Sequence, residues 1–317
     1  MKFNWGIAVL KFIAAYCVVC NHFGAHPMWC WVCDYAVPVF MMLAFMLGRR
    51  LWESREFVLL YERLKRLTIP FVVWSLLYWL VSIADRGVSV RSLLGQLVFG
   101  HTVCVPLYFY VLLIWFTVGV WLVGYIVRNE QMRWTLSVVV LIGCLYLQYS
   151  GLNERIVYCL PDAIFAGRYP LGRVVELLPA ALVGLGLSRI SSMDFVVKHS
   201  RITALLCTIA FGLSYFCRLY FSPPGGFHYH GVHLLLGSVG LVGLAYLLGR
   251  EIKCSVAVES VIRMLSVPLM GVYCVHMLVG RFVPYVERGA VKSFIVFSVS
   301  LGITGLVAKS KLRSLVA

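Results

Sequence analysis

The chain has 317 residues, of which 61% are hydrophobic and 13% are charged, and its mean hydropathy is +0.89. A soluble globular protein carries about 25% charged residues, so a soluble fold of this length could not cover its surface with so few. Apolar and aromatic residues run throughout the chain, which excludes a disordered, collagen-like or disulfide-scaffold protein. The composition therefore predicts an all-α, polytopic membrane helical bundle.

The chain is strongly basic, with 28 Lys and Arg against 13 Asp and Glu and a formal net charge of +15. The basic residues stand between apolar runs rather than on one soluble face, so we expect no nucleic-acid partner. Their placement instead fits the positive-inside rule and contact with anionic headgroups of a lipid bilayer. The bilayer is therefore the first partner that the sequence predicts.

Runs of roughly 20 apolar residues, the length that crosses the hydrocarbon, predict about ten transmembrane helices in a single domain covering residues 1–317. Lys11 interrupts the first run, so we expect an uncleaved span rather than a signal peptide. Residues 49–66 alternate bulky apolar with basic residues and predict a short amphipathic helix at the interface. The predicted spans are 4–23, 29–48, 67–84, 106–127, 134–150, 174–189, 202–221, 232–249, 265–284 and 290–308.

Lys and Arg are distributed unequally between the two sets of loops. With the N-terminus inside, 18 of them fall on the cytoplasmic side, 7 on the outer side and 3 within spans. The positive-inside rule then predicts that the N-terminus and the C-terminus are both cytoplasmic. The histidines show the opposite bias, because six of the eight lie at or near the outer face. They indicate either a site open to the outer side or ordinary loop residues.

Two patterns raise the question of a metal ion. His228, His230 and His233 cluster after a Pro-Pro-Gly-Gly segment, but no acidic or cysteine ligand lies close by, which favours an acceptor-side loop. Cys30 and Cys33 form a C-x-x-C without a second pair, so a redox or metal role is open but has no further support. We predict no metal site.

Lys11 and His22 lie on the first predicted span. An ionisable residue inside a span usually faces the bundle interior and marks a functional site, although Lys11 could also snorkel to the interface. Eleven residues on a helix return to within roughly 20° of the starting direction, about 16 Å further along the axis. A cation midway and an imidazole at the outer end suit an anionic donor, with the imidazole as general base.

Five segments of this chain, in the same order, resemble the motifs of the acyltransferase-3 family of membrane acyltransferases. The first is a basic residue, ten intervening residues and a histidine, as in L-K-F-I-A-A-Y-C-V-V-C-N-H. The others are V-P-V-F, R-L-K-R-L-T-I-P-F, P-L-Y-F-Y and M-G-V-Y-C-V-H. In chain order the five segments are Leu10–His22, Val37–Phe40, Arg63–Phe71, Pro106–Tyr110 and Met270–His276.

The resemblance implies a bacterial inner-membrane enzyme that moves an acyl group, usually acetyl, from cytosolic acetyl-CoA or another acyl-CoA. The acceptor would be a hydroxyl or amino group of a sugar, a surface polysaccharide or a lipid-linked glycan precursor. His22 would be the catalytic base, although a covalent acyl-enzyme variant stays open. Oligomeric state is not indicated. The remaining expected site residues are Lys11, Arg63 and Arg66 for the donor, and Tyr273, His276 and Tyr108 for the substrate or its channel.

The sequence departs from the family's pattern at three places. Ala44-Phe45 follows the second motif where the family usually has Ser-Gly, Tyr108 replaces a tryptophan, and Lys11 replaces an arginine. Lysine lacks the planar fork that suits a phosphate. These changes concern the donor channel and leave His22 in place.

Other interpretations of the same residues stay open. Lys11, Arg218 and Arg281 within spans suit the anion pathway of a transporter or flippase, although the repeated halves of many transporters are not apparent. In a non-catalytic scaffold these charges would be structural. Arg63 and Arg66 could equally be positive-inside anchors, and Arg173 with Glu176 could be a structural ion pair.

Overall fold

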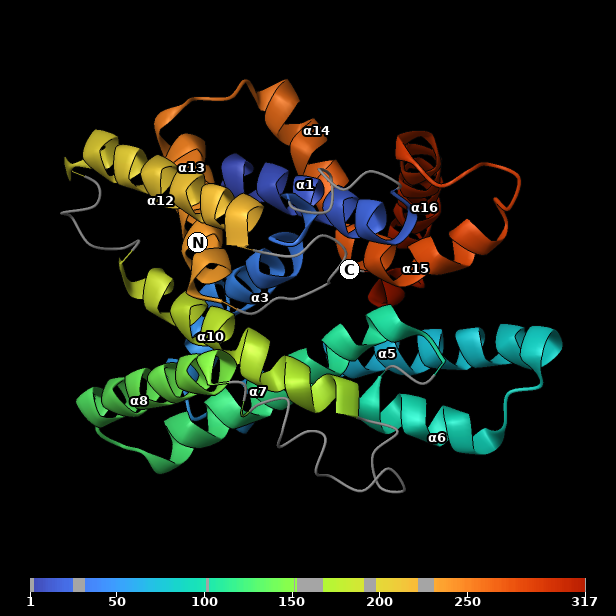
Figure 1. Ribbon diagram of the computed structural model, residues 1–317, viewed down its shortest axis with the longest axis horizontal. Helices are drawn as coiled ribbons and strands as arrows, with labels where there is room; N and C mark the ends of the chain where they lie inside the picture. Colours follow the sequence, from blue (N-terminus) through green and yellow to red (C-terminus); the bar gives the residue numbers. More distant parts are fainter. Residues whose placement is uncertain are drawn as a thin grey trace. The chain divides into compact units, whose positions relative to one another are not determined.

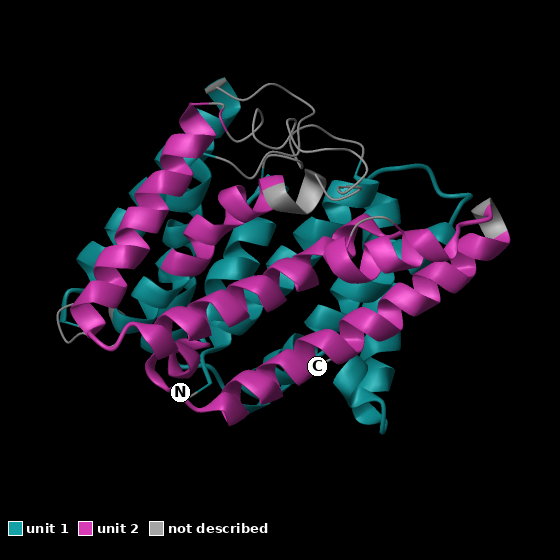
Figure 2. Ribbon diagram, turned by 90° about the horizontal axis from the view of Figure 1, so that it is seen from below, with its two compact units in different colours: residues 1–47, 183–317 teal, residues 48–182 magenta. Residues whose placement is uncertain are grey.

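The computed structural model describes residues 3–24, 32–100, 103–150, 152, 168–190, 198–221 and 231–316. Within these ranges the chain is all helical and has no strand (Figure 1), which confirms the predicted all-α class. The described helices form two compact units, which Figure 2 shows in teal and magenta. Unit 1 consists of residues 1–47 and 183–317, and unit 2 of residues 48–182.

Unit 1 is built around α1, which contacts five other helices of the unit: α3, α13, α14, α15 and α16. The most extensive helix–helix packing in the unit is between α12 and α13, which lie side by side. Its elements are α1 (Trp5–Phe23), α3 (Ala36–Met46), the last part of α10 (Arg168–Ile190), α12 (Ser200–Phe221), α13 (Val232–Glu251), α14 (Val256–Ser266), α15 (Leu269–Arg281), α16 (Ala290–Lys309) and the 3-10 turn η2 (Arg313–Leu315).

Local chemistry sets the start of α1 and its close approach to α13. The side chain of Asn4 accepts a hydrogen bond from the backbone N–H of Ile7, which is the usual N-cap arrangement. The amide of Asn4 also donates to the carbonyl oxygen of Tyr246 at 2.9 Å. A methyl group at Gly6 would overlap the backbone of Ala245. Glycine therefore lets the two helix backbones pack directly against each other.

A buried ion pair joins the start of α3 to the end of α12. The guanidinium of Arg218 donates to Asp34 through Nε at 3.0 Å and Nη2 at 2.5 Å, and both side chains are at most 4% exposed. Beside it, the hydroxyls of Tyr35 and Ser214 lie 2.8 Å apart. Charges buried this deeply need a hydrogen-bonded partner. The pair therefore explains how an aspartate lies inside the second predicted span.

Unit 2 is held together by contacts of α7 with α4, α5 and α6. Inside it, Arg133 donates through Nη1 to the carbonyl oxygen of Trp52 at 2.7 Å, which ties α8 to α4. Its elements are α4 (Arg49–Glu53), α5 (Phe57–Arg86), α6 (Val90–Phe99), the 3-10 turn η1 (Val105–Leu107), α7 (Tyr108–Ile126), α8 (Glu130–Tyr149) and the first part of α10.

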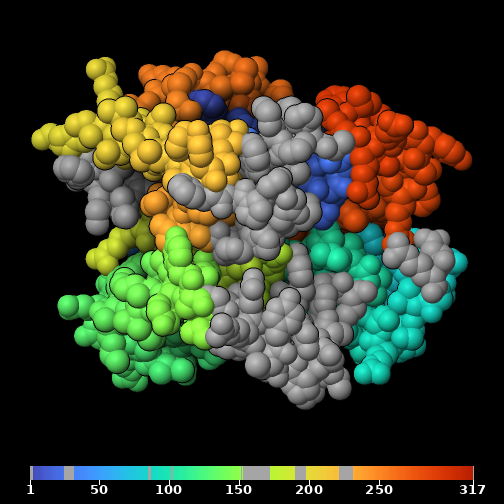
Figure 3. Space-filling model, viewed as in Figure 1, coloured from blue at the N-terminus to red at the C-terminus, as the bar shows by residue number. Residues whose placement is uncertain are grey.

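Seven helices of the described chain are long and apolar enough to cross a membrane: α1, α5, η1 with α7, α8, α12, α13 and α16. Each coincides with one of the predicted spans. Their outer faces are apolar as a bilayer requires; on α12, for example, Leu206 is 59% and Leu213 62% exposed. Figure 3 shows the side chains of this helix at the surface, in yellow. The chain is therefore a multi-pass membrane protein.

The remaining three predicted spans differ from the structure, so the count of about ten is not confirmed. The span 265–284 is broken, because α14 and α15 meet at a bend of 51° next to Pro268. A proline cannot donate to the preceding turn and disfavours helix before it. The span 29–48 corresponds to α3, which has only 11 residues, and residues 29–31 lie outside the described chain. The span 174–189 lies within α10, a helix of 23 residues that is not among the seven.

The segment predicted as an interfacial helix, residues 49–66, falls on two helices. It comprises α4 and the first ten residues of α5, which then continues without a break through Pro70 to Arg86. A proline is tolerated in a membrane-spanning helix because neighbouring groups can satisfy the freed carbonyl. The interfacial position of this segment, the single domain and the cytoplasmic termini stay predictions.

Candidate active site

The C-terminal end of α1 brings His22 beside a histidine from the far end of the sequence. The rings of His22 and His276 have their centroids 5.2 Å apart and are tilted by 36°. His22 is half-buried, whereas His276 on α15 is completely buried. Two imidazoles at this distance, one of them partly accessible, can both take part in the transfer of a proton. The structure therefore brings together the predicted catalytic histidine and one of the predicted substrate residues.

The hydrogen bonds of His276 fix which of its nitrogens is available. Nδ1 lies 3.2 Å from the carbonyl oxygen of Val272, and a carbonyl can only accept, so Nδ1 carries the hydrogen. In the neutral ring Nε2 is then an acceptor. Within the described chain this buried Nε2 has no hydrogen-bond partner. A buried acceptor of this kind is costly, and it suits a substrate hydroxyl.

Asn21, the residue before His22, provides a second buried acceptor. Its amide nitrogen donates to the carbonyl oxygen of Cys33 at 3.2 Å, which fixes the side chain at the end of α1. Its Oδ1 has no partner among the residues that the structure describes. Two unsatisfied acceptors, Oδ1 of Asn21 on α1 and Nε2 of His276 on α15, thus belong to neighbours of His22, and both are chemically suited to a hydroxyl or amino donor.

Phe23 and Lys292 complete the surroundings of the histidine pair. The ring of Phe23 lies edge-on to His276 with centroids 6.3 Å apart, and the ammonium of Lys292 lies 5.8 Å from the centroid of the Phe23 ring. Lys292 is only 8% exposed. Lys292 lies two residues into the apolar helix α16, and this position is the signal in the sequence that its side chain is buried.

Phe23 is also held from two other sides. Its carbonyl oxygen accepts a hydrogen bond from the backbone N–H of Gly289 at 2.7 Å, just before α16 begins. On α15, Gly280 leaves the space that the Phe23 ring occupies, because a methyl group at this position would overlap the ring. Helices α1, α15 and α16 therefore fix the residue that follows His22.

Lys11 lies on the same uninterrupted helix as His22, as predicted. It is half-buried, and no hydrogen bond or ion pair joins it to any described residue. The stripe of α1 between Lys11 and His22 passes Ala15 and Val18, which are 2% and 3% exposed. Neighbouring helices thus cover the stripe in this structure. A donor that reached along it would require these helices to separate.

The other predicted site residues are placed as follows. Tyr273 is buried one turn before His276 on α15, with the two rings 6.0 Å apart. Tyr108, Arg63 and Arg66 belong to unit 2: Tyr108 is buried at the start of α7, and Arg66 on α5 is exposed. Arg63 donates through Nε to the hydroxyl of Thr117 at 3.2 Å. That these three residues serve the same site as His22 stays a prediction.

The described residues contain no group of three or more His, Cys, Asp and Glu side chains that could hold a metal ion. Cys30 of the C-x-x-C motif, and His228 and His230 of the histidine cluster, lie outside the described chain. Arg173 and Glu176 do form the ion pair that the sequence suggested.

Comparison with known protein families gives one result. The model of the acyltransferase-3 family, described as an acyltransferase domain, matches residues 4–308. This match covers nearly the whole chain and includes both histidines of the pair. No curated protein and no solved structure matches the chain.

Proposed function

The chain belongs to the acyltransferase-3 family, and from this premise we propose that it transfers an acyl group, most simply acetyl, from acyl-CoA to a sugar. The acceptor would be a hydroxyl or amino group of a surface polysaccharide or of a lipid-linked glycan precursor. The single observation that supports this most is the pairing of His22 with His276, whose Nε2 is a buried acceptor. The proposed location is the inner membrane of a bacterium.

In the proposed step, an imidazole nitrogen of His22 takes the proton of the acceptor hydroxyl as its oxygen attacks the thioester carbonyl. A C–O bond forms, the C–S bond breaks, and the CoA thiolate leaves with the proton returned by His22. The free Nε2 of His276 would accept a hydrogen bond from a hydroxyl of the acceptor and so orient it. An acyl-enzyme route through a nucleophile is the proposed variant.

We assign donor binding to three cations. Arg63, Arg66 and Lys11 would hold the phosphates of CoA by charge-assisted hydrogen bonds. A half-buried guanidinium such as Arg63, fixed by Thr117, suits this role because little side-chain entropy remains to be lost. Tyr108 and Tyr273 would line the channel. Because Ala15 and Val18 are covered, this proposal requires a movement of the helices on α1 when the donor enters.

The alternative of a transporter or flippase for an anionic solute or glycolipid has less support. One of the three charges that favoured an anion pathway, Arg218, is buried in an ion pair with Asp34. Its charge is therefore already neutralised by the fold. Lys11 remains available to either function.

The test is transfer of radiolabelled acetyl from acetyl-CoA to cell-envelope glycan by membranes that contain the wild type or His22→Gln. Loss of a general base lowers the rate by about 10²- to 10⁴-fold, so we expect label in the wild type and almost none in the variant. The matched control is His199→Gln, at the entrance to α12. His199 lies outside the site, so this variant should keep full activity.

Equal labelling by the wild type and His22→Gln would remove His22 from the mechanism. No label with either protein, at equal expression, would contradict acetyl-CoA as the donor. In that case, movement of an anionic solute across vesicles that contain the protein would support the transporter instead.

A further inference from the structure

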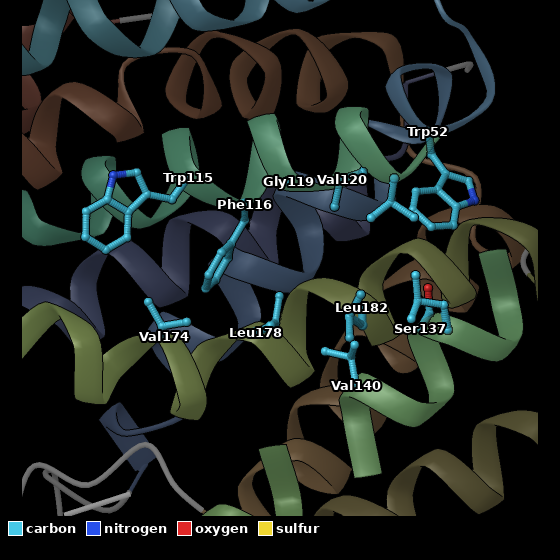
Figure 4. Close-up of a pocket in the computed structure, with 12 residues that line it drawn as sticks. Trp52, Trp115, Phe116, Gly119, Val120, Ser137, Val140, Val174, Leu178 and Leu182 are labelled. Carbon is cyan, nitrogen blue, oxygen red and sulfur yellow. The ribbon is translucent and has the colours of Figure 1, made fainter. Parts of the chain in front are cut away.

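Unit 2 contains a cavity of about 280 Å³ between α4, α7, α8 and α10. Its walls are almost entirely apolar, and Figure 4 shows Phe116, Val120, Val140, Leu178 and Leu182 around it. Small-molecule sites usually measure about 300–1,000 Å³, so this cavity has the size for one slender ligand. A hydrocarbon chain fits such walls better than a polar solute does.

One end of the cavity, lined by Trp52 and Ser137, differs from the rest because two unpaired hydrogen-bond donors lie at it or next to it. Trp52 lines this end, is 3% exposed, and its indole N–H has no partner within the described chain. The guanidinium carbon of Arg133 lies 5.5 Å from the centroid of the Trp52 ring. Arg133 stands one turn before Ser137, which lines the same cavity from α8.

Arg133 has unused binding capacity despite its burial. It is 8% exposed, and only its Nη1 is engaged, with the carbonyl oxygen of Trp52. Its Nε lacks a hydrogen-bond partner, and no carboxylate of the described residues pairs with it. A buried cation without a counter-charge is strongly unfavourable. The missing partner should therefore be an anion.

The cavity also reaches the apolar surface of unit 2. Leu136 lines it and is 39% exposed, and Val139 on the same helix is 60% exposed. Gly119, in the opposite wall on α7, leaves open space where a side chain would stand. A chain from the surrounding bilayer could therefore enter from the side without crossing water.

We propose that this cavity binds one acyl chain of an anionic membrane phospholipid, whose phosphate is held by Arg133 and the indole N–H of Trp52. The tail fills the apolar walls, and the phosphate supplies the charge that Arg133 lacks. Basic pockets between transmembrane helices bind anionic headgroups on the cytoplasmic side, and the positive-inside rule predicts that Arg133 faces that side. The proposal does not depend on acyl transfer.

The test is lipid retention measured by native mass spectrometry. The purified full-length protein is delipidated in detergent and offered phosphatidylglycerol and phosphatidylcholine that have identical acyl chains. We expect the wild type to retain one phosphatidylglycerol, at least about fivefold more than phosphatidylcholine, because one arginine favours a headgroup with a net negative charge over a zwitterionic headgroup by about this ratio. Equal retention of the two lipids would overturn the proposal.

Two variants with matched controls locate the site. Gly119→Leu fills the cavity, and no atom lies within 4 Å of the added Cβ, so the fold should tolerate it. Gly143→Leu on α8 meets equally open space but lies outside the cavity. Arg133→Gln removes the proposed phosphate ligand, and its control is the exposed Arg128→Gln.

We expect Gly119→Leu and Arg133→Gln to lose the bound phosphatidylglycerol at least fivefold and both controls to keep it. Retention by Gly119→Leu equal to that by Gly143→Leu would place the lipid elsewhere and overturn the proposal. Dodecanoyl-CoA is added as a competitor. If it displaces the lipid and binds with the same sensitivity to Gly119→Leu, the cavity belongs to the acyl donor and the lipid assignment is wrong.

Discussion

Two buried polar groups of unit 1 differ in whether their hydrogen bonds are satisfied. At the start of α3, the carboxylate of Asp34 is held by two nitrogens of Arg218. At the end of α1, His276 has one nitrogen engaged and one without a partner in the described chain. A satisfied pair fixes structure, whereas an unsatisfied acceptor beside a half-buried histidine is available to a substrate. Substitutions in the two places should therefore have opposite consequences.

The largest effect is expected from Asp34→Ala, on stability. Removing one partner of a buried ion pair leaves an uncompensated charge and costs about 3–5 kcal/mol. Thermal unfolding of the purified protein in detergent should show a clear loss of stability. The double variant Asp34→Ala/Arg218→Met removes both charges and should recover part of the loss. If the single variant is as stable as the wild type, the pair has no structural role.

His276→Phe should have the converse effect. Phenylalanine keeps an aromatic ring but removes both the unsatisfied Nε2 and the hydrogen bond of Nδ1 to the carbonyl oxygen of Val272. These two losses act in opposite directions, so the free energy of unfolding should change by less than about 2 kcal/mol. Acyl transfer should fall by about 10²-fold, as for loss of one positioned hydrogen-bonding group in an active site. Activity and thermal unfolding are measured on the same preparation. A stable, fully active variant would contradict the assignment of His276 to the site.

The contrast between these two places was only partly visible in the sequence. The all-α class and seven spans could be predicted, because each span is an apolar run whose own length indicates a membrane-crossing helix. The pairing of His22 with His276 could not be predicted in the same way, because 254 positions separate them and only the packing of α1 on α15 brings them together. The same holds for Arg218, which the sequence suggested as part of an anion pathway and the fold pairs with Asp34.

Two prolines inside predicted spans have different effects on the helix. Pro268 stands inside the predicted span 265–284, and its restriction on the preceding residues was a usable signal for the bend between α14 and α15. Pro70 has the opposite outcome, because α5 continues through it. A proline's effect depends on whether neighbours can satisfy the freed carbonyl, and this is tertiary information. Single residues therefore cannot decide helix continuity within a membrane.

Gly280→Ala tests whether the position of His22 matters, because it displaces the neighbouring Phe23 and leaves the chemical groups of the site unchanged. The added methyl overlaps the ring of Phe23, which follows His22, and overpacking of this kind costs about 1–3 kcal/mol. We expect a moderate loss of stability together with a fall in acyl transfer per folded protein. Gly302→Ala on α16 meets open space and is the matched control. It should be neutral or more stable, by up to about 1 kcal/mol. Equal activity of the two variants would show that Phe23 does not position His22.

The smallest effect is expected from substitution of Lys292. This substitution tests whether the buried ammonium has a structural role, as the Asp34–Arg218 pair does, or takes part in acyl transfer. A cation over an aromatic ring contributes about 0.5–2 kcal/mol, whereas burial of an ammonium without a counter-charge is unfavourable, so Lys292→Met should change stability only slightly. If the ammonium also stabilises the negative charge that develops during acyl transfer, the rate at saturating donor should fall about tenfold, and Lys292→Arg should restore most of it. A purely structural lysine would give the same small change in stability with an unchanged rate, because the contact with Phe23 alone does not act on the reaction. The rate of acyl transfer by Lys292→Met relative to that of the wild type, at equal amounts of folded protein, therefore separates the two roles.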